Sequence, residues 1–175
     1  MSDIYTLSYR LTSKSINNMI VLLQKVQTQL PTMNHSESDL LSSKLAPDMF
    51  DLKKQIQLIS DQAKGMCARL AGINSPVMED TETTIDQLIK RLKITVEFIQ
   101  NIPEDAYAHA DDRVIVLPWM VQMMPGKGLS AEEFFVNFAV PNFYFYMVTA
   151  YGIMRHMGYN IGKFDYIGQM EMVNV

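Results

Sequence analysis

Cysteine, histidine and long hydrophobic runs are scarce in this chain. Of its 175 residues one is cysteine and three are histidine, which excludes an internal disulfide and a cysteine-based metal cluster. We expect the single cysteine, Cys67, to be a small buried hydrophobic residue rather than a nucleophile. The most apolar stretch, residues 134–154, is interrupted by a proline and two asparagines, so it does not predict a membrane-spanning helix. The N-terminal residues lack the pattern of a secretion signal, and the cytoplasm is the expected compartment.

Excess basic charge is also lacking. The formal net charge is -4, and no stripe of lysine and arginine is present that could neutralise phosphates, so nucleic acid is not an expected partner. No serine lies in a nucleophile elbow, and the sequence contains no glycine-rich phosphate loop, since Gly126-Lys127-Gly128 is too short. The sequence therefore disfavours nucleophilic and phosphoryl-transfer enzymes.

Apolar residues recur at helical intervals in four segments. Pro31 closes the first segment, Gly72 ends the second, and Pro103 follows the third. Thr83 with Asp86, and a Ser-Ala-Glu-Glu string at 130–133, resemble the capping pairs that begin helices. The predicted helices are 3–30, 48–71, 83–101 and 130–157. We expect one all-α domain over residues 1–175, a four-helix bundle with long connectors.

The connectors carry further signals. Residues 32–45 are polar and rich in serine. Before the last helix the helical period fails, and the β-branched run from Arg113 to Leu117 predicts a small irregular or β-like excursion. Three acids, Glu79, Asp80 and Glu82, precede the third helix. Acids at this position stabilise the positive N-terminal end of that helix. The alternative is that they bind a hard cation.

The segment PNFYFYMVTAYGIMRHMG, residues 141–158, is apolar or aromatic on nearly every side. Such a helix is typical of the centre of a bundle. Its polar members Asn142, Tyr146, Thr149 and His156 are spaced four, three and seven apart, which places them on one helix face. A buried polar row needs hydrogen-bond partners, so this row either lines a polar pocket or is tied up internally. His156 could instead meet free carbonyls in the last helical turn.

The second predicted helix offers partners for this row. Gln55 and Gln62 are seven residues apart and therefore lie on one flank of that helix. We expect Gln55 or Gln62 to face Asn142 and Tyr146 across one shared polar cavity. Six residues are thus candidates for a small-ligand pocket: Gln55, Gln62, Asn142, Tyr146, Thr149 and His156. The neighbouring Asp61 needs a cation such as Lys64 or Arg155 if it faces inward.

Five strings in a consistent order resemble an uncharacterised bacterial family of unknown function in the DinB/YfiT-like four-helix-bundle superfamily, which is regarded as one of metalloenzymes. They are LAPDMF at 45–50, DQAKGMCARLAG at 61–72, EDTETT at 79–84, FAVPNFYFYMVTAYGIMRH at 138–156 and GKFDYIG at 162–168. The resemblance implies a DinB-like bundle, commonly a homodimer. It also implies, in metal-binding members, a divalent ion such as zinc or nickel held by one histidine of the second helix and an HxxxH pair of the fourth.

The chain departs from that pattern. Its second predicted helix has no histidine, and the four-residue steps of the last helix join Asn142 to Tyr146 and Tyr146 to Ala150. An amide and a phenol are poor substitutes for imidazole. We therefore expect no metal cofactor, and we expect a homodimeric module that binds a small ligand or is catalytically degenerate. The alternative is a metal-dependent enzyme of the DinB-like thiol-transferase type with atypical ligands, Asp61 and His156.

Overall fold

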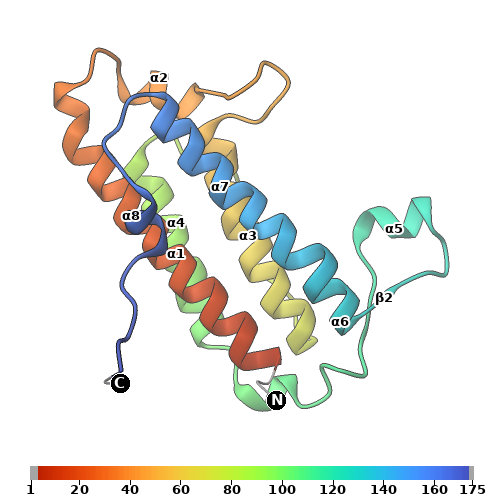
Figure 1. The fold of residues 1–175 in the computed structure, drawn as a ribbon. Helices are drawn as coiled ribbons and strands as arrows, with labels where there is room; N and C mark the ends of the chain where they lie inside the picture. The colour runs from red at the N-terminus through yellow and green to blue at the C-terminus, as the bar shows by residue number, and fades with distance from the viewer. Residues whose placement is uncertain (1–3, 174–175) are drawn as a thin grey trace.

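The structure is a computed structural model that describes residues 4–173, and four long helices dominate it (Figure 1). These are α1 (Ile4–Gln29), α3 (Leu52–Ala71), α4 (Ile85–Gln100) and α7 (Val140–His156). The predicted all-α four-helix bundle is confirmed. The short helical elements are η1 (Leu30–Thr32), α2 (Glu37–Ser42), η2 (Glu104–Tyr107), α5 (Pro118–Met123), α6 (Ala131–Glu133), η3 (Phe134–Ala139) and α8 (Lys163–Ile167). No helix of this described range is long and apolar enough to cross a membrane.

Helix α3 lies at the centre of the bundle. It packs against α1, α4 and α7, and α1 packs in turn against α4. Contacts of α7 with α1 are few, although the Ser15 and Tyr144 hydroxyls approach to 3.3 Å. The prediction that α7 occupies the centre is therefore wrong. Helix α7 is apolar on its outer side as well, and there Phe145 and Val148 are 57% and 55% exposed.

Local capping decides where the helices begin. Asp51 accepts a hydrogen bond from the backbone N–H of Lys54, so α3 starts at Leu52 rather than near residue 48. Helix α4 is capped by Thr84 with Gln87, one residue later than the predicted pair. Within the connector at 32–45, Ser36 and Asp39 form a capping box that produces the short helix α2.

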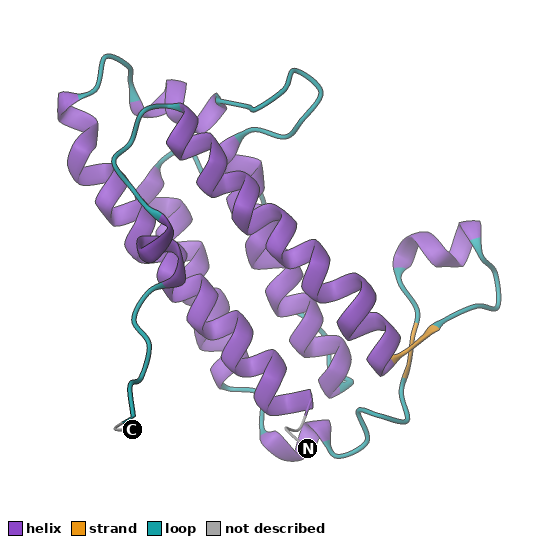
Figure 2. Cartoon of the chain, in the orientation of Figure 1, coloured by secondary structure: helices purple, strands orange, loops and turns teal. Residues whose placement is uncertain are grey.

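The last helix runs through Pro141 without stopping. The segment Phe134–Ala139 is π-helical and leads directly into α7. Proline has no backbone N–H for the α-helical hydrogen-bond pattern. The π-helical segment before Pro141 has a different hydrogen-bond pattern, and the helix continues through it. The excursion before this helix holds two short antiparallel strands, β1 (Val114–Ile115) and β2 (Leu129–Ser130), with α5 between them (Figure 2). This confirms the predicted β-like excursion.

Candidate functional site

The polar row of α7 forms one hydrogen bond with α3. Asn142 Nδ2 donates a hydrogen bond to Gln62 Oε1 over 2.9 Å, and both side chains are half-buried. Tyr146, one turn further along α7, is half-buried, and its ring packs edge-on against Phe145. The structure thus places two of the six candidate residues in direct contact across the α3–α7 interface.

The other candidates make separate contacts. Gln55 is buried and donates to the backbone carbonyl of Phe50, while its Oε1 is buried without a hydrogen-bond partner. Thr149 donates to the carbonyl of Phe145 over 2.7 Å, which satisfies its hydroxyl within α7. His156 is exposed in the last helical turn. None of the six lines the large cavity described below or the smaller ones beside Arg91 and beside Asp51, and a ligand pocket formed by the row stays a prediction.

The alternative metal ligands lie far apart. Helices α3 and α7 run in opposite directions (Figure 1). Asn142 is level with Gln62, the neighbour of Asp61, because the two side chains are hydrogen-bonded. His156 lies roughly 21 Å beyond Asn142, at about 1.5 Å per residue. Among the residues that the structure describes, no group of three or more histidine, cysteine, aspartate or glutamate side chains could hold a metal ion. Asn142 and Gln62 are amides, which are weak ligands for zinc or nickel, and they are bonded to each other, so this donor set does not fit such an ion.

Asp61 faces a buried arginine instead. Its Oδ1 lies 2.6 Å from Lys64 Nζ and 2.9 Å from Arg91 Nη2. Lys64 was one of the two partners expected for Asp61, whereas Arg155, the other, donates to the carbonyl of Tyr159. Arg91 was not predicted, because its spacing on the third helix does not distinguish it from a surface arginine.

Arg91 is the centre of an ionic network between α3, α4 and the segment that joins them. Its side chain is 2% exposed and contacts Asp61, Asp80 at 3.1 Å and Glu82 at 3.0 Å, and it donates to the carbonyl of Glu79. Asp80 and Glu82 therefore pair with Arg91 rather than serving the end of the helix, which Thr84 caps, and Glu79 contributes its backbone carbonyl. We call the following residues the Arg91 cluster: Lys54, Asp61, Lys64, Asp80, Glu82 and Arg91.

The charges of the Arg91 cluster shift the pKa values of its members. Burial alone raises the pKa of Asp80, but the hydrogen bond and charge of Lys54 and the charge of Arg91 outweigh it, so the pKa is lowered. Burial likewise raises the pKa of Glu82, and hydrogen bonds from Gln57 and Arg91 lower it by more. Burial lowers the pKa of Arg91, but its bond to Glu82 and the charge of Asp61 leave the pKa raised. All three groups are held in their charged forms.

Cys67 behaves as its sequence context predicts. It is buried with 0% exposure, and its Sγ lies 3.6 Å from the Thr12 hydroxyl. Burial raises the pKa of the thiol to about 11. A thiol that stays protonated at neutral pH is a poor nucleophile.

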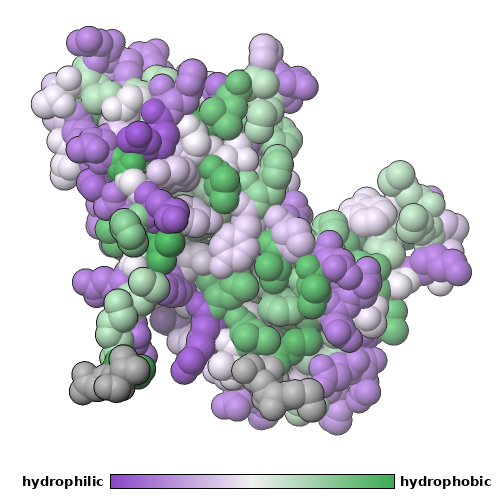
Figure 3. Space-filling model, in the orientation of Figure 1, coloured by the Kyte–Doolittle hydropathy of each residue, from purple (hydrophilic) through white to green (hydrophobic). Residues whose placement is uncertain are grey.

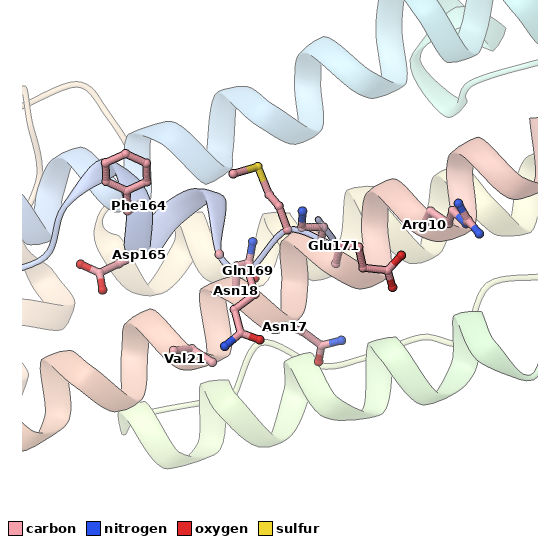
Figure 4. Close-up of a pocket in the computed structure, with 11 residues that line it drawn as sticks. Arg10, Asn17, Asn18, Val21, Phe164, Asp165, Gln169 and Glu171 are labelled. Atoms are coloured by element: carbon pink, nitrogen blue, oxygen red, sulfur yellow. The ribbon is translucent and has the colours of Figure 1, made fainter. Parts of the chain in front are cut away.

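A large cavity lies elsewhere, between α1 and the C-terminal segment. This α1 cleft has a volume of about 1050 Å³ (Figure 4). Its lining residues are Arg10, Lys14, Asn17, Asn18, Val21, Phe164, Asp165, Gly168, Gln169, Met170 and Glu171. Basic, amide and apolar side chains thus share one open concave surface.

Specific contacts fasten the C-terminal wall of the α1 cleft to α1. Asn18 Nδ2 donates to the carbonyls of Tyr166 and Ile167 over 3.1 and 2.7 Å. Lys25 lies 2.9 Å from Asp165, which also accepts from the backbone N–H of Gly162 and so caps α8. The chain then turns at Gly168, where φ is 70° and a side chain would collide with Asn18.

The residues of this cleft carry no distinctive pattern in the sequence. Its α1 wall is the polar face of a surface helix, which by itself is typical of a solvated surface. The only local signal was the string GKFDYIG at 162–168, whose glycines and aspartate now form a cap and a turn. The partner wall is more than a hundred residues away in the chain, so only the tertiary structure brings the two together.

Comparisons with known proteins agree with this fold. Residues 4–167 match the family described as Domain of unknown function (DUF1993). The crystal structure of a DinB family member protein from Shewanella denitrificans at 1.83 Å resolution is 34% identical, over 98% of this chain and 95% of that chain, with a TM-score of 0.91. No curated protein matches the sequence. The resemblance noted in the sequence is confirmed: the chain belongs to the DUF1993 family and has a DinB-like fold.

Proposed function

We propose that this protein is a small-ligand-binding DinB-like module that works without a three-histidine metal centre. The α1 cleft is the observation that carries the proposal. Its volume of about 1050 Å³ is at the upper end of the range of small-molecule sites. Val21, Phe164 and Met170 offer apolar contact surface, and Arg10 and Lys14 supply charge that could orient a ligand.

The α3–α7 interface supports the second half of the proposal. On the two helices from which the resemblance draws imidazole ligands, Asn142 and Gln62 bond to each other through neutral amides. Amide groups are weak ligands for zinc or nickel. The competing hypothesis, a thiol-transferase-type enzyme using Asp61 and His156, has no geometric support, since Asp61 is paired with two cations and His156 is exposed.

Filling the α1 cleft is expected to abolish ligand binding. Asn17 is exposed and lines the cleft, so Asn17→Trp would occupy its volume. Gln24→Trp is the matched control, because Gln24 is exposed on α1 outside the lining. In a ligand-observed NMR screen of neutral and charged fragments, we expect hits on the wild type to disappear with Asn17→Trp and to persist with Gln24→Trp. Hits that persist with both variants would refute the cleft as the binding site.

Metal content gives a second test. Protein purified without chelator is expected to carry well below one zinc, nickel or manganese ion per chain by elemental analysis, because no described donor set suits these ions. His156→Ala should leave that content unchanged. About one ion per chain, lost on substitution of His156 or Asp61, would instead support the metal-dependent alternative.

We further propose that the protein is a homodimer packed through α7. The sequence is rich in methionine and tyrosine, with 14 and 8 residues, and α7 is apolar on its outer side. Phe145 and Val148 are three residues apart and therefore adjacent on the helix surface. Hydrophobic side chains gather over α7 and the neighbouring part of α1 (Figure 3). A second copy packed on this face would explain why a helix with one buried side is apolar all round.

A further inference from the structure

We propose that the ligand of the α1 cleft is an amphipathic anion, a carboxylate or phosphate that carries an apolar chain. This inference rests on the proposed function and specifies the chemistry of the molecule that the cleft takes.

The charge of the cleft selects an anion. Arg10 and Lys14 are one turn apart on α1, both are exposed, and neither has an ion-pair partner among the residues that the structure describes. Asp165 is paired with Lys25 at 2.9 Å, which leaves Glu171 as the one lining acid without a salt bridge in residues 4–173. Two unpaired cations against one unpaired acid give the cleft a positive surplus, although the whole chain has a net charge of -4.

The apolar residues of the cleft select a ligand with a hydrophobic part. Val21, Phe164 and Met170 are 55%, 77% and 52% exposed, although all three line one cavity. Exposed apolar side chains that converge in a cavity gain free energy when an apolar group covers them. Side chains of the protein do not provide that cover.

Two of the apolar residues and Arg10 are separated along the cleft. Phe164 and Val21 lie toward one end and Arg10 toward the other (Figure 4). At about 1.5 Å per residue, Val21 lies roughly 10 Å from Lys14 and roughly 16 Å from Arg10 along α1. A charged head near Arg10 and Lys14 with a tail reaching Val21 and Phe164 matches this arrangement. Medium-length chains therefore fit the cleft.

Calorimetric titration with decanoate, decyl phosphate and uncharged decanol tests the ligand class. We expect both anions to bind the wild type more tightly than decanol does. The double variant Arg10→Gln/Lys14→Gln should weaken anion binding at least about tenfold, the order expected for two cations near 4 Å in a water-like dielectric. Lys93→Gln/Lys127→Gln removes the same charge at exposed positions outside the cleft and should stay within about twofold of the wild type.

The outcomes separate this inference from the proposed function. Tighter binding of either anion supports the inference and selects carboxylate or phosphate as the head group. Decanol that binds as tightly as both anions, or anion binding that the Arg10/Lys14 double variant leaves unchanged, overturns the ligand class. If Asn17→Trp still abolishes binding in that case, the cleft remains the site and the proposed function stands. If Asn17→Trp has no effect either, both proposals fail.

Discussion

Arg91→Met is expected to lower the free energy of unfolding by about 3 kcal/mol. The methionine would fill a similar volume but would leave Asp61, Asp80 and Glu82 without their central cation. Breaking a buried ion pair costs about 3–5 kcal/mol, and we take the low end because Asp61 and Asp80 are 34% and 36% exposed and partly screened by water. For a chain of this size the melting temperature should fall by roughly 6–12 °C.

Thermal and denaturant unfolding measure this effect, with Lys90→Met as the control. Lys90 is the exposed neighbour of Arg91, and its replacement should change stability by no more than about 0.5 kcal/mol. A second change, Glu82→Gln, should cost less in the Arg91→Met background than in the wild type, because the two side chains interact directly. An Arg91→Met protein as stable as the Lys90→Met control would contradict a structural role for the Arg91 cluster.

Acid should remove the same stabilisation. The pKa values of Asp80 and Glu82 are lowered in the folded chain from their ordinary values of 3.8 and 4.5. Groups shifted in this direction stabilise the folded state above their ordinary pKa values, and the stabilisation is lost as the pH falls through the lowered ones. Wild-type stability should therefore decline below about pH 4.5. The decline should be shallower in Arg91→Met, where the main cation is missing.

Phe145→Glu/Val148→Glu is expected to convert a dimer into a monomer. If α7 forms the dimer interface, two carboxylates on each chain would be buried without partners beside their symmetry mates. Burial of unpaired charge costs several kcal/mol, and each 1.4 kcal/mol corresponds to a tenfold change in affinity. Light scattering should give about twice the chain mass of 20.0 kDa for the wild type and the single mass for the variant.

Val77→Glu supplies the control for this experiment. Val77 is 94% exposed in the segment between α3 and α4, so the same change in chemistry there should leave the dimer intact. Circular dichroism should show unchanged helix content in the Phe145/Val148 variant, since both side chains point away from the core. A wild type that is monomeric at micromolar concentration would refute the dimer, and a double variant that stays dimeric would exclude α7 as its interface.

The helices were predictable because their signals are local. Apolar spacing located all four, and Gly72 ended the second as predicted, with φ of 70°. The starts of α3 and α4 lay four and two residues later than predicted, where more than one nearby residue could cap. Thr83 and Thr84 illustrate this, since either residue type can cap a helix and the structure has Thr84 accepting from the backbone of Gln87. Ser36 and Asp39 match a capping box, but the short helix α2 that they begin was not predicted.

The candidate site was less predictable, because its contacts join distant segments. Spacing on two helices predicted that Asn142 faces Gln55 or Gln62, and the structure has Asn142 bonded to Gln62. Spacing could not predict that Arg91 pairs with acids of the preceding segment, or that Asn18 donates to the backbone at Tyr166 and Ile167. A polar residue on a surface face and one in a charged cluster have the same sequence pattern.

The sequence by itself determined the fold class, the order of the helices and the absence of histidines from the positions that the resemblance assigns to metal ligands. Those features depend on periodicity, capping and residue type, which are properties of short segments. Only the tertiary structure decided that α7 lies at the edge of the bundle, that Arg91 is buried, and that α1 and the C-terminal segment enclose a cleft. Burial and charge pairing depend on which surfaces meet, and surfaces more than a hundred residues apart meet only in the folded chain.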